Sequence, residues 1–580
     1  MPPLSLEILA LGMCLTVVTF LQFPTLGADN FILTKLLVLT VFGPAAAVFR
    51  LTETRDHPGE RADVLLLFIL LLAVLSSTQA VNSWYAIAAT GSLLASVLLF
   101  WVSRSLAASG FRETLLLVVV GAVGIVLATA LLEAYTGLQL STRQPGGTVG
   151  NRNRMAHLLV MGLPTLALLT ARVRGRWGLM ALMSTWGIVG MALALSRTRA
   201  AWVALGALLF VAMLLTACRM LLRKPLPAPS TQRRLAGSFI LLCLGGGVAA
   251  VAPNSLNWTS ATPYRDSISS LLDHRSGSGA GRLVEYANTV GMIRDHPMLG
   301  VGPGNWRVHY PYYATENDPT LGIGHEPVRR YGMSEWVSAA AERGLLSFLL
   351  LVWFGGVLLI HWARQIAVES SPVVSYAFAG VTTLTAIVLI GVLDPVVQTP
   401  IGGFVVPILV GAYAPTLRMT RPRSLPGIVR RSLMAGLVLV GLFTSSFRIR
   451  EVWAAWTYAS HLTADALERA AKIAPGDFRV RILSAMVLVE TGDCEAALPH
   501  LAVAREVYPT AAIVRDLRGR CEDLPESPPL ERDVGPVSVD DIGGVIGLAG
   551  LVGGTVVSGG EPSATPHKLW YIGGECSKMV

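Results

Sequence analysis

Charged residues are scarce in this sequence. Asp, Glu, Lys and Arg make up 14% of the 580 residues, whereas 53% are hydrophobic. A soluble protein rarely reaches this balance, because its surface must be solvated. The apolar residues are also clustered in windows without charge, such as 64–75, 115–132 and 348–360. A bilayer core requires about 20 such residues per helix and tolerates no unpaired backbone, so we expect membrane-spanning helices.

Apolar runs long enough to span a membrane occur about thirteen times, which predicts an all-α, polytopic transmembrane bundle. The first run opens directly after Met1 without a basic segment before it, so we expect it to stay in the protein as a helix rather than be cleaved as a signal peptide. The expected spans are near 4–24, 31–49, 63–80, 84–103, 114–135, 155–171, 177–195, 200–218, 235–253, 344–362, 374–393, 399–417 and 432–446.

Cysteine is also scarce: the six residues lack the spacing of a metal site. Cys14, Cys218 and Cys243 fall in or beside apolar runs, where we expect small buried side chains. Cys494 and Cys521 lie in the more polar C-terminal part, and they can form a disulfide if that part faces an oxidising compartment.

Basic residues produce a net charge of +9, which in a soluble chain would suggest nucleic-acid binding. Here they concentrate in short connections between apolar runs, as in cytoplasmic loops of membrane proteins. We therefore expect no nucleic-acid partner and a cytoplasmic N-terminus. That orientation turns six connections inward: 50–61, 104–112, 172–176, 219–234, 361–364 and 418–431.

Besides two very short connections, the same orientation places five segments on the outer face: 136–154, 196–199, 254–343, 394–399 and the chain after the last span. Two of them are basic although they lie outside, with Arg143, Arg152, Arg154, Arg197 and Arg199. A lone arginine can reach toward lipid phosphate. Several converging guanidinium groups favour a specific anion, because they match phosphate oxygens bidentately. An anionic, lipid-linked ligand reached from outside is therefore the candidate.

Four motifs resemble the O-antigen ligase and O-antigen polymerase superfamily. Residues 282–306, RLVEYANTVGMIRDHPMLGVGPGNW, are similar to its signature outer loop and combine a helical apolar spacing with a Gly/Pro-rich turn. Residues 147–156 resemble its glycine-asparagine entry to a central helix, 196–202 its arginine turn, and 334–344 the lead into the next span. The resemblance covers about 140–450, in the order of the family.

The resemblance implies a glycosyl transfer that needs no metal or cofactor, at the periplasmic face of the bacterial inner membrane. The donor would be an undecaprenyl-diphosphate-linked glycan in the membrane lipid, and the acceptor a hydroxyl. Negative charge builds on the leaving diphosphate, so preorganised cations lower the barrier. Arg199 and Arg282 match the positions to which the family assigns that role. Further residues expected to bind substrate are Asn151, Arg152, Arg154, Arg197, Asn305 and Trp306.

The general base is where this sequence departs from the ligase branch, which carries a histidine about eleven residues before the glycine matched by Gly344. This chain has Met333 there, which cannot accept a proton. The nearest candidates are His325 and Glu335, of which we prefer Glu335 because it opens the matching helix. Either can also be an ordinary surface residue. The missing histidine favours a polymerase, but the acceptor, a lipid A core or another lipid-linked repeat, stays open.

The C-terminal part changes character after residue 446. Pro475 and Pro509 are 34 positions apart, the tetratricopeptide period, with Gly492 at the expected turn between helices. The expected domains are a membrane domain at 1–446, a tetratricopeptide-like region at 447–525, and a linker with a Gly-rich tail of unassigned role at 526–580. Such helical pairs need neighbours, so docking on the membrane domain or on polysaccharide-assembly proteins is expected; a simple helical cap is the alternative.

Two other function classes fit a membrane protein of this kind. A transporter or flippase of lipid-linked saccharides would bind the diphosphate through the arginines without chemistry, and a membrane scaffold would recruit partners through the repeat region. Transporters often contain topological repeats. The sequence has no evident internal symmetry, and its long outer segment favours catalysis.

Overall fold

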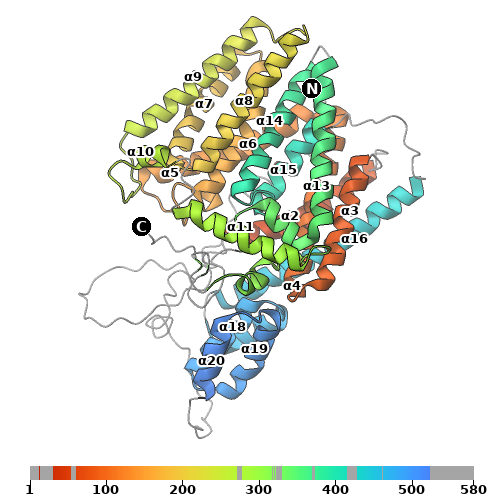
Figure 1. Cartoon of the computed structure of the whole chain (residues 1–580), viewed down its shortest axis with the longest axis vertical. Helices are drawn as coiled ribbons and strands as arrows, with labels where there is room; N and C mark the ends of the chain where they lie inside the picture. Colours follow the sequence, from red (N-terminus) through yellow and green to blue (C-terminus); the bar gives the residue numbers. More distant parts are fainter. Residues whose placement is uncertain are drawn as a thin grey trace.

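The computed structural model describes residues 12, 31–53, 61–270, 277–315, 318, 321, 330–368, 372–414, 427–459 and 462–522. Within these residues every regular element is a helix, which confirms the all-α fold. Figure 1 shows long helices standing side by side and a smaller group, α18 to α20, at one end of them. The predicted span 4–24 lies outside the described residues except for one position.

Twelve apolar helices correspond to the other twelve predicted spans. In the described part, ten stretches are long and apolar enough to cross a membrane, and one of these contains both α4 and α5, which meet at Gly110. The helices are α2 (Leu33–Glu53), α3 (Arg61–Ser76), α4 (Ser83–Leu106), α5 (Arg112–Thr136), α6 (Arg152–Arg172), α7 (Arg176–Ser196), α8 (Arg199–Leu221), α9 (Pro229–Val251), α13 (Glu335–Val368), α14 (Pro372–Leu393), α15 (Pro400–Tyr413) and α16 (Gly427–Ala459).

Helix α15 is shorter than the predicted span 399–417. Its 14 residues cover roughly 21 Å, less than the ~30 Å of a bilayer core. All of them are buried, because the surrounding helices rather than lipid cover α15 on every side. The helix begins beside Thr399, whose hydroxyl accepts the N–H of Gly402 at 3.3 Å. A short helix thus ends inside the bundle, next to the loop that precedes it.

Two other helices extend beyond their predicted limits. Helix α13 begins at Glu335 rather than 344 and changes direction at Gly344, which has φ +79°. A side chain there would overlap the backbone of Met298, so glycine lets the outer segment approach. Helix α16 continues to Ala459, past the expected domain boundary at 446, and joins the bundle to the C-terminal helices.

The periphery of the bundle includes α8 and α9, which leave most of their surface uncovered. Cys218 and Cys243 lie there and are exposed, so the expectation that they are buried was wrong. Apolar periodicity cannot distinguish a lipid-facing position from a protein-facing one, because both are apolar.

The outer segment contributes α10 (Pro263–Ser269), α11 (Gly277–Asp295) and α12 (Trp306–His309). The helix predicted around 283–293 is confirmed as α11, which crosses the end of the long helices (Figure 1). The five segments predicted to share one face are linked at this end. Their contacts run from Thr198 to Asn153, from Arg199 to Ser270, from Arg282 to Asp394 and from Tyr508 to Arg307.

The C-terminal helices are α17 (Ala464–Ile473), α18 (Phe478–Glu490), α19 (Cys494–Val507) and α20 (Ala512–Glu522). The predicted turn at Gly492 is confirmed between α18 and α19. Cys494 and Cys521 form a disulfide. The group docks on the bundle: the hydroxyls of Tyr508 and Thr510 donate to the carbonyls of Arg307 and Val308 at 2.8 and 3.1 Å. The tetratricopeptide resemblance stays a prediction.

Candidate active site

The loop between α14 and α15, residues 394–399, is held by two of the predicted catalytic residues. From α11, Arg282 donates through Nε to the carbonyl of Leu393 at 2.8 Å, and its Nη2 lies 3.4 Å from Asp394 Oδ2. From the start of α13, Glu335 Oε2 accepts backbone N–H groups of this loop. The three donors are Val396 at 2.9 Å, Val397 at 3.1 Å and Gln398 at 3.3 Å. Arg282 and Glu335, distant in sequence, therefore fix the same few residues.

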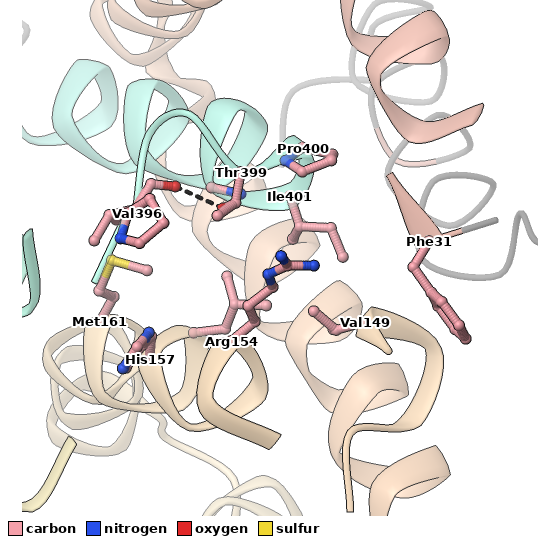
Figure 2. Close-up of a pocket in the computed structure, with 12 residues that line it drawn as sticks. Phe31, Val149, Arg154, His157, Met161, Val396, Thr399, Pro400 and Ile401 are labelled. Atoms are coloured by element: carbon pink, nitrogen blue, oxygen red, sulfur yellow. Dashed lines mark hydrogen bonds between the residues drawn. The ribbon is translucent and has the colours of Figure 1, made fainter. Parts of the chain in front are cut away.

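One face of this loop closes a pocket, here called the first pocket (Figure 2). Helix α6 places Arg154 and His157 on one face, as their three-residue spacing requires. Figure 2 shows the Arg154 guanidinium directed toward Ile401 and Pro400 at the start of α15. The imidazole Nε2 of His157 lies 3.6 Å from Asp394 Oδ2, so Asp394 connects α6 with Arg282. The wall is completed by Phe31, Val149, Leu158, Met161, Pro395, Val396, Thr399 and Gly402.

Cations outnumber carboxylates around the first pocket. Lys35 of α2 is fully buried, donates to the carbonyl of Thr148 and lies close enough to Arg154 for their charges to interact. Arg154 and Arg282 bring two formal positive charges, against one from Asp394, and Lys35 is a further basic group beside Arg154. The N-terminus of α15 adds the positive end of its dipole. Buried charge needs a partner, so this arrangement suits a multiply charged anion such as a diphosphate.

A second group of predicted arginines surrounds Trp258 in the outer segment. The guanidinium groups of Arg152 and Arg197 lie 4.8 and 4.7 Å from its ring. Arg197 also donates to Ser267 at 2.9 Å, and burial lowers its pKa below the usual value. Arg199, the first residue of α8, donates to the carbonyl of Ser270 at 2.5 Å. These arginines anchor the outer segment on α6 and α8.

The arginine group lies beside the entry of α6. Thr198, in the turn before α8, donates to Asn153 Oδ1 at 3.1 Å, and Asn153 is the residue before Arg154. The predicted arginines therefore lie in two groups near the N-terminal end of α6. Arg154 lines the first pocket, and Arg152, Arg197 and Arg199 contact the outer segment.

Three residues expected to bind substrate are instead engaged with the protein. Asn305 is fully buried and exchanges two hydrogen bonds with the backbone of Asn82, at 2.8 and 3.0 Å. The Trp306 ring is buried, and its Nε1 donates to Thr289 at 3.1 Å. Asn151 caps α6 by accepting the N–H of Asn153 at 2.8 Å. These side chains hold the outer segment and the start of α6 in place, so we assign them a structural role.

Of the two candidate bases, the structure describes only Glu335. Glu335 is buried, and its carboxylate borders a second pocket on the opposite face of the loop. His325 lies outside the described residues. Met333, at the position of the family histidine, is buried, and its N–H donates to Glu285 Oε1 on α11.

Sequence reasoning missed Asp394, His157 and Lys35. Each carried a usable signal: an ionisable residue within or directly after an apolar run is expensive in a membrane and marks a functional site by default. Their convergence could not be read from the sequence, because it depends on which spans are neighbours.

A comparison with known families bears on this geometry. Residues 184–352 match the model of the O-antigen ligase family. No curated protein matches the chain. The ligase-like segment runs from α7 into α13 and contains Arg199, Arg282 and Glu335, whereas Arg154 and Asp394 lie outside it. The match and the apolar helices support a multi-pass membrane enzyme of polysaccharide assembly, with lipid-linked glycan as substrate.

Proposed function

We propose that this chain is a membrane glycosyltransferase of the O-antigen polymerase or ligase type. It would transfer an undecaprenyl-diphosphate-linked glycan to an acceptor hydroxyl at the periplasmic face of the inner membrane. The observation that carries the proposal is the first pocket, which Arg154 and His157 line at the α14–α15 loop, with the Arg282–Asp394 pair next to His157. The ligase-like segment contains Arg282 and Glu335, which hold this loop.

In the proposed reaction, the acceptor oxygen bonds to the anomeric carbon while the bond from that carbon to the diphosphate oxygen breaks. The electron pair of the broken bond goes to the diphosphate, whose growing charge is stabilised by Arg154, Lys35 and Arg282. The acceptor proton goes to a base, for which Glu335 is our candidate. The three backbone N–H groups that donate to Glu335 Oε2 keep the carboxylate oriented.

The proposed orientation rests on charge and on the disulfide. Basic connections meet at the end opposite to the first pocket: Arg50 donates to Ser105 at 2.9 Å and Arg234 to the carbonyl of Val173 at 2.8 Å. The Cys494–Cys521 disulfide belongs to the helices docked at the pocket end. Disulfides persist in the periplasm and are rare in the cytosol, which supports a periplasmic site.

A transporter of lipid-linked saccharides is the competing function, and the short buried α15 favours it, because transporters bind ligands at broken helices. Purified full-length protein in detergent should be supplied with the lipid-linked glycan extracted from its host membranes. We expect undecaprenyl diphosphate to be released together with a longer or transferred glycan. Binding without any release of the lipid diphosphate would reject the enzyme and leave the transporter.

A further inference from the structure

The opposite face of the α14–α15 loop closes a second pocket, defined by its position between α2, α4, the start of α13 and α16. Its charged lining residues are Glu335, Glu342, Arg343 and Arg448. Two carboxylates face two guanidinium groups, so their formal charges balance. The first pocket carries excess positive charge, whereas the second is polar but close to neutral. A neutral ligand with both donors and acceptors therefore fits the second pocket better than a phosphate does.

Two hydrogen-bond donors belong to side chains that line the second pocket. Gln398 Nε2 and Arg448 Nε are buried, and neither finds a hydrogen-bond partner in the part of the chain that the structure describes. Arg448 is held in place because its Nη1 donates to Glu451 at 2.6 Å. An unpaired buried donor is unfavourable, so both positions call for a ligand that accepts hydrogen bonds.

The rest of the lining suits the faces of a sugar ring. Leu36 and Leu39 of α2 and Leu93 of α4 provide apolar walls, while the carboxylates of Glu335 and Glu342 can accept hydrogen bonds from hydroxyls. A sugar hydroxyl both donates and accepts, and ring C–H groups bury against apolar side chains. This combination matches the lining.

We propose that the second pocket binds a neutral, hydroxyl-rich sugar unit of the glycan, on the other side of the loop from the diphosphate. This inference rests on the proposed function for the identity of the ligand. Val396 lines the first pocket and Val397 the second, and the N–H groups of both bond to Glu335. A diphosphate and a sugar unit bound in the two pockets would lie on the two sides of this loop.

The test measures binding rather than transfer. The probes are the host's glycan, cleaved from its lipid by mild acid and dephosphorylated, and inorganic pyrophosphate. Each is titrated by calorimetry into the full-length protein in detergent. Gln398→Met keeps the side-chain volume and removes the donor, so we expect glycan to bind ~5- to 10-fold more weakly and pyrophosphate as before. Arg154→Ala should weaken pyrophosphate and spare the glycan.

The matched control is Gln79→Met, an exposed glutamine at the same end of the bundle, which should change neither affinity. Gln398→Glu serves as a second variant if Gln398→Met unfolds at a lower temperature. The second pocket is not a sugar site if the unmodified protein does not bind the glycan. The same conclusion follows if the unmodified protein and both Gln398 variants bind it equally. Transfer activity is scored separately: active transfer with unchanged glycan binding rejects this inference alone, whereas Gln398-dependent binding without transfer rejects the proposed enzyme alone.

Discussion

At the scale of single residues, Arg282 combines a hydrogen bond to a carbonyl with a contact to Asp394, a pairing that the planar guanidinium fork favours. We expect Arg282→Ala to lower transfer by ~100- to 1,000-fold, the usual effect of losing one transition-state donor. Arg282→Lys should restore little of it. Release of undecaprenyl diphosphate is the measurement, and Arg294→Ala, an exposed arginine on the same helix, is the control. Full activity in Arg282→Ala would remove this residue from the site.

Glu335 has two proposed roles, as an anchor of the α14–α15 loop and as the general base, and one substitution can separate them. Glu335→Gln keeps an oxygen for the N–H groups of the α14–α15 loop but cannot take a proton, so we expect a normal unfolding temperature and ~100-fold slower transfer. His325→Ala should matter little. Normal transfer by Glu335→Gln together with an inactive His325→Ala would move the base to the histidine. If both variants are active, Glu335 acts as a loop anchor alone.

His309 predicts a pH dependence of the outer segment. Burial and the nearby His296 ring, 5.8 Å away, lower the pKa of His309 to about 4. An unfolded histidine titrates near 6.5, so the folded state binds fewer protons than the unfolded state between about pH 6.5 and 4. The stability that results is complete above pH 6.5 and is lost as the pH falls toward 4.

The measurement is the unfolding temperature between pH 7.5 and 5. We expect it to fall with acidification more steeply in the unmodified protein than in His309→Gln, which cannot titrate at this position. Parallel curves for the two proteins would show that His309 does not control the acid sensitivity.

At the scale of elements, α7 and α9 are joined by close backbone contact. A Cβ on Gly245 would overlap the carbonyl of Gly187, whereas one on Gly247 meets nothing within 4 Å. We expect Gly245→Ala to destabilise the bundle by about 1–3 kcal/mol through overpacking. Gly247→Ala should be neutral or stabilise the helix by up to ~1 kcal/mol. The unfolding temperatures of the two variants are compared in one detergent. Equal temperatures would mean that α7 and α9 can move apart without a loss of stability.

At the scale of the whole molecule, the orientation of the chain in the membrane determines whether the two pockets lie on the periplasmic or the cytoplasmic side. We expect an impermeant maleimide added outside intact cells to label Met298→Cys, at an exposed position of the outer segment, and to spare Ser230→Cys at the start of α9. Both variants are made without Cys218 and Cys243, which are exposed. Labelling of Ser230→Cys alone would invert the protein and place the site in the cytoplasm.

The sequence determined the order and approximate positions of the twelve apolar helices in the part of the chain that the structure describes, because bilayer hydrocarbon admits only long apolar helices. It also predicted α11 and the turn at Gly492, since these depend on periodicity and on short motifs. The roles of Arg282 and Glu335 stay predictions. The short length and complete burial of α15 were not predicted, because an apolar run does not reveal whether lipid or protein covers it.

Only the tertiary structure decided how the site is assembled. Lys35, His157, Arg282, Glu335 and Asp394 come from five parts of the chain, and no pattern along the sequence encodes which helices are neighbours. The same limit explains Asn305 and Trp306, whose polar and aromatic groups suggested a ligand but which have protein partners, in Asn82 before α4 and in Thr289 of α11. A side chain's chemistry is fixed by the sequence, whereas its partner is set by the packing of distant helices.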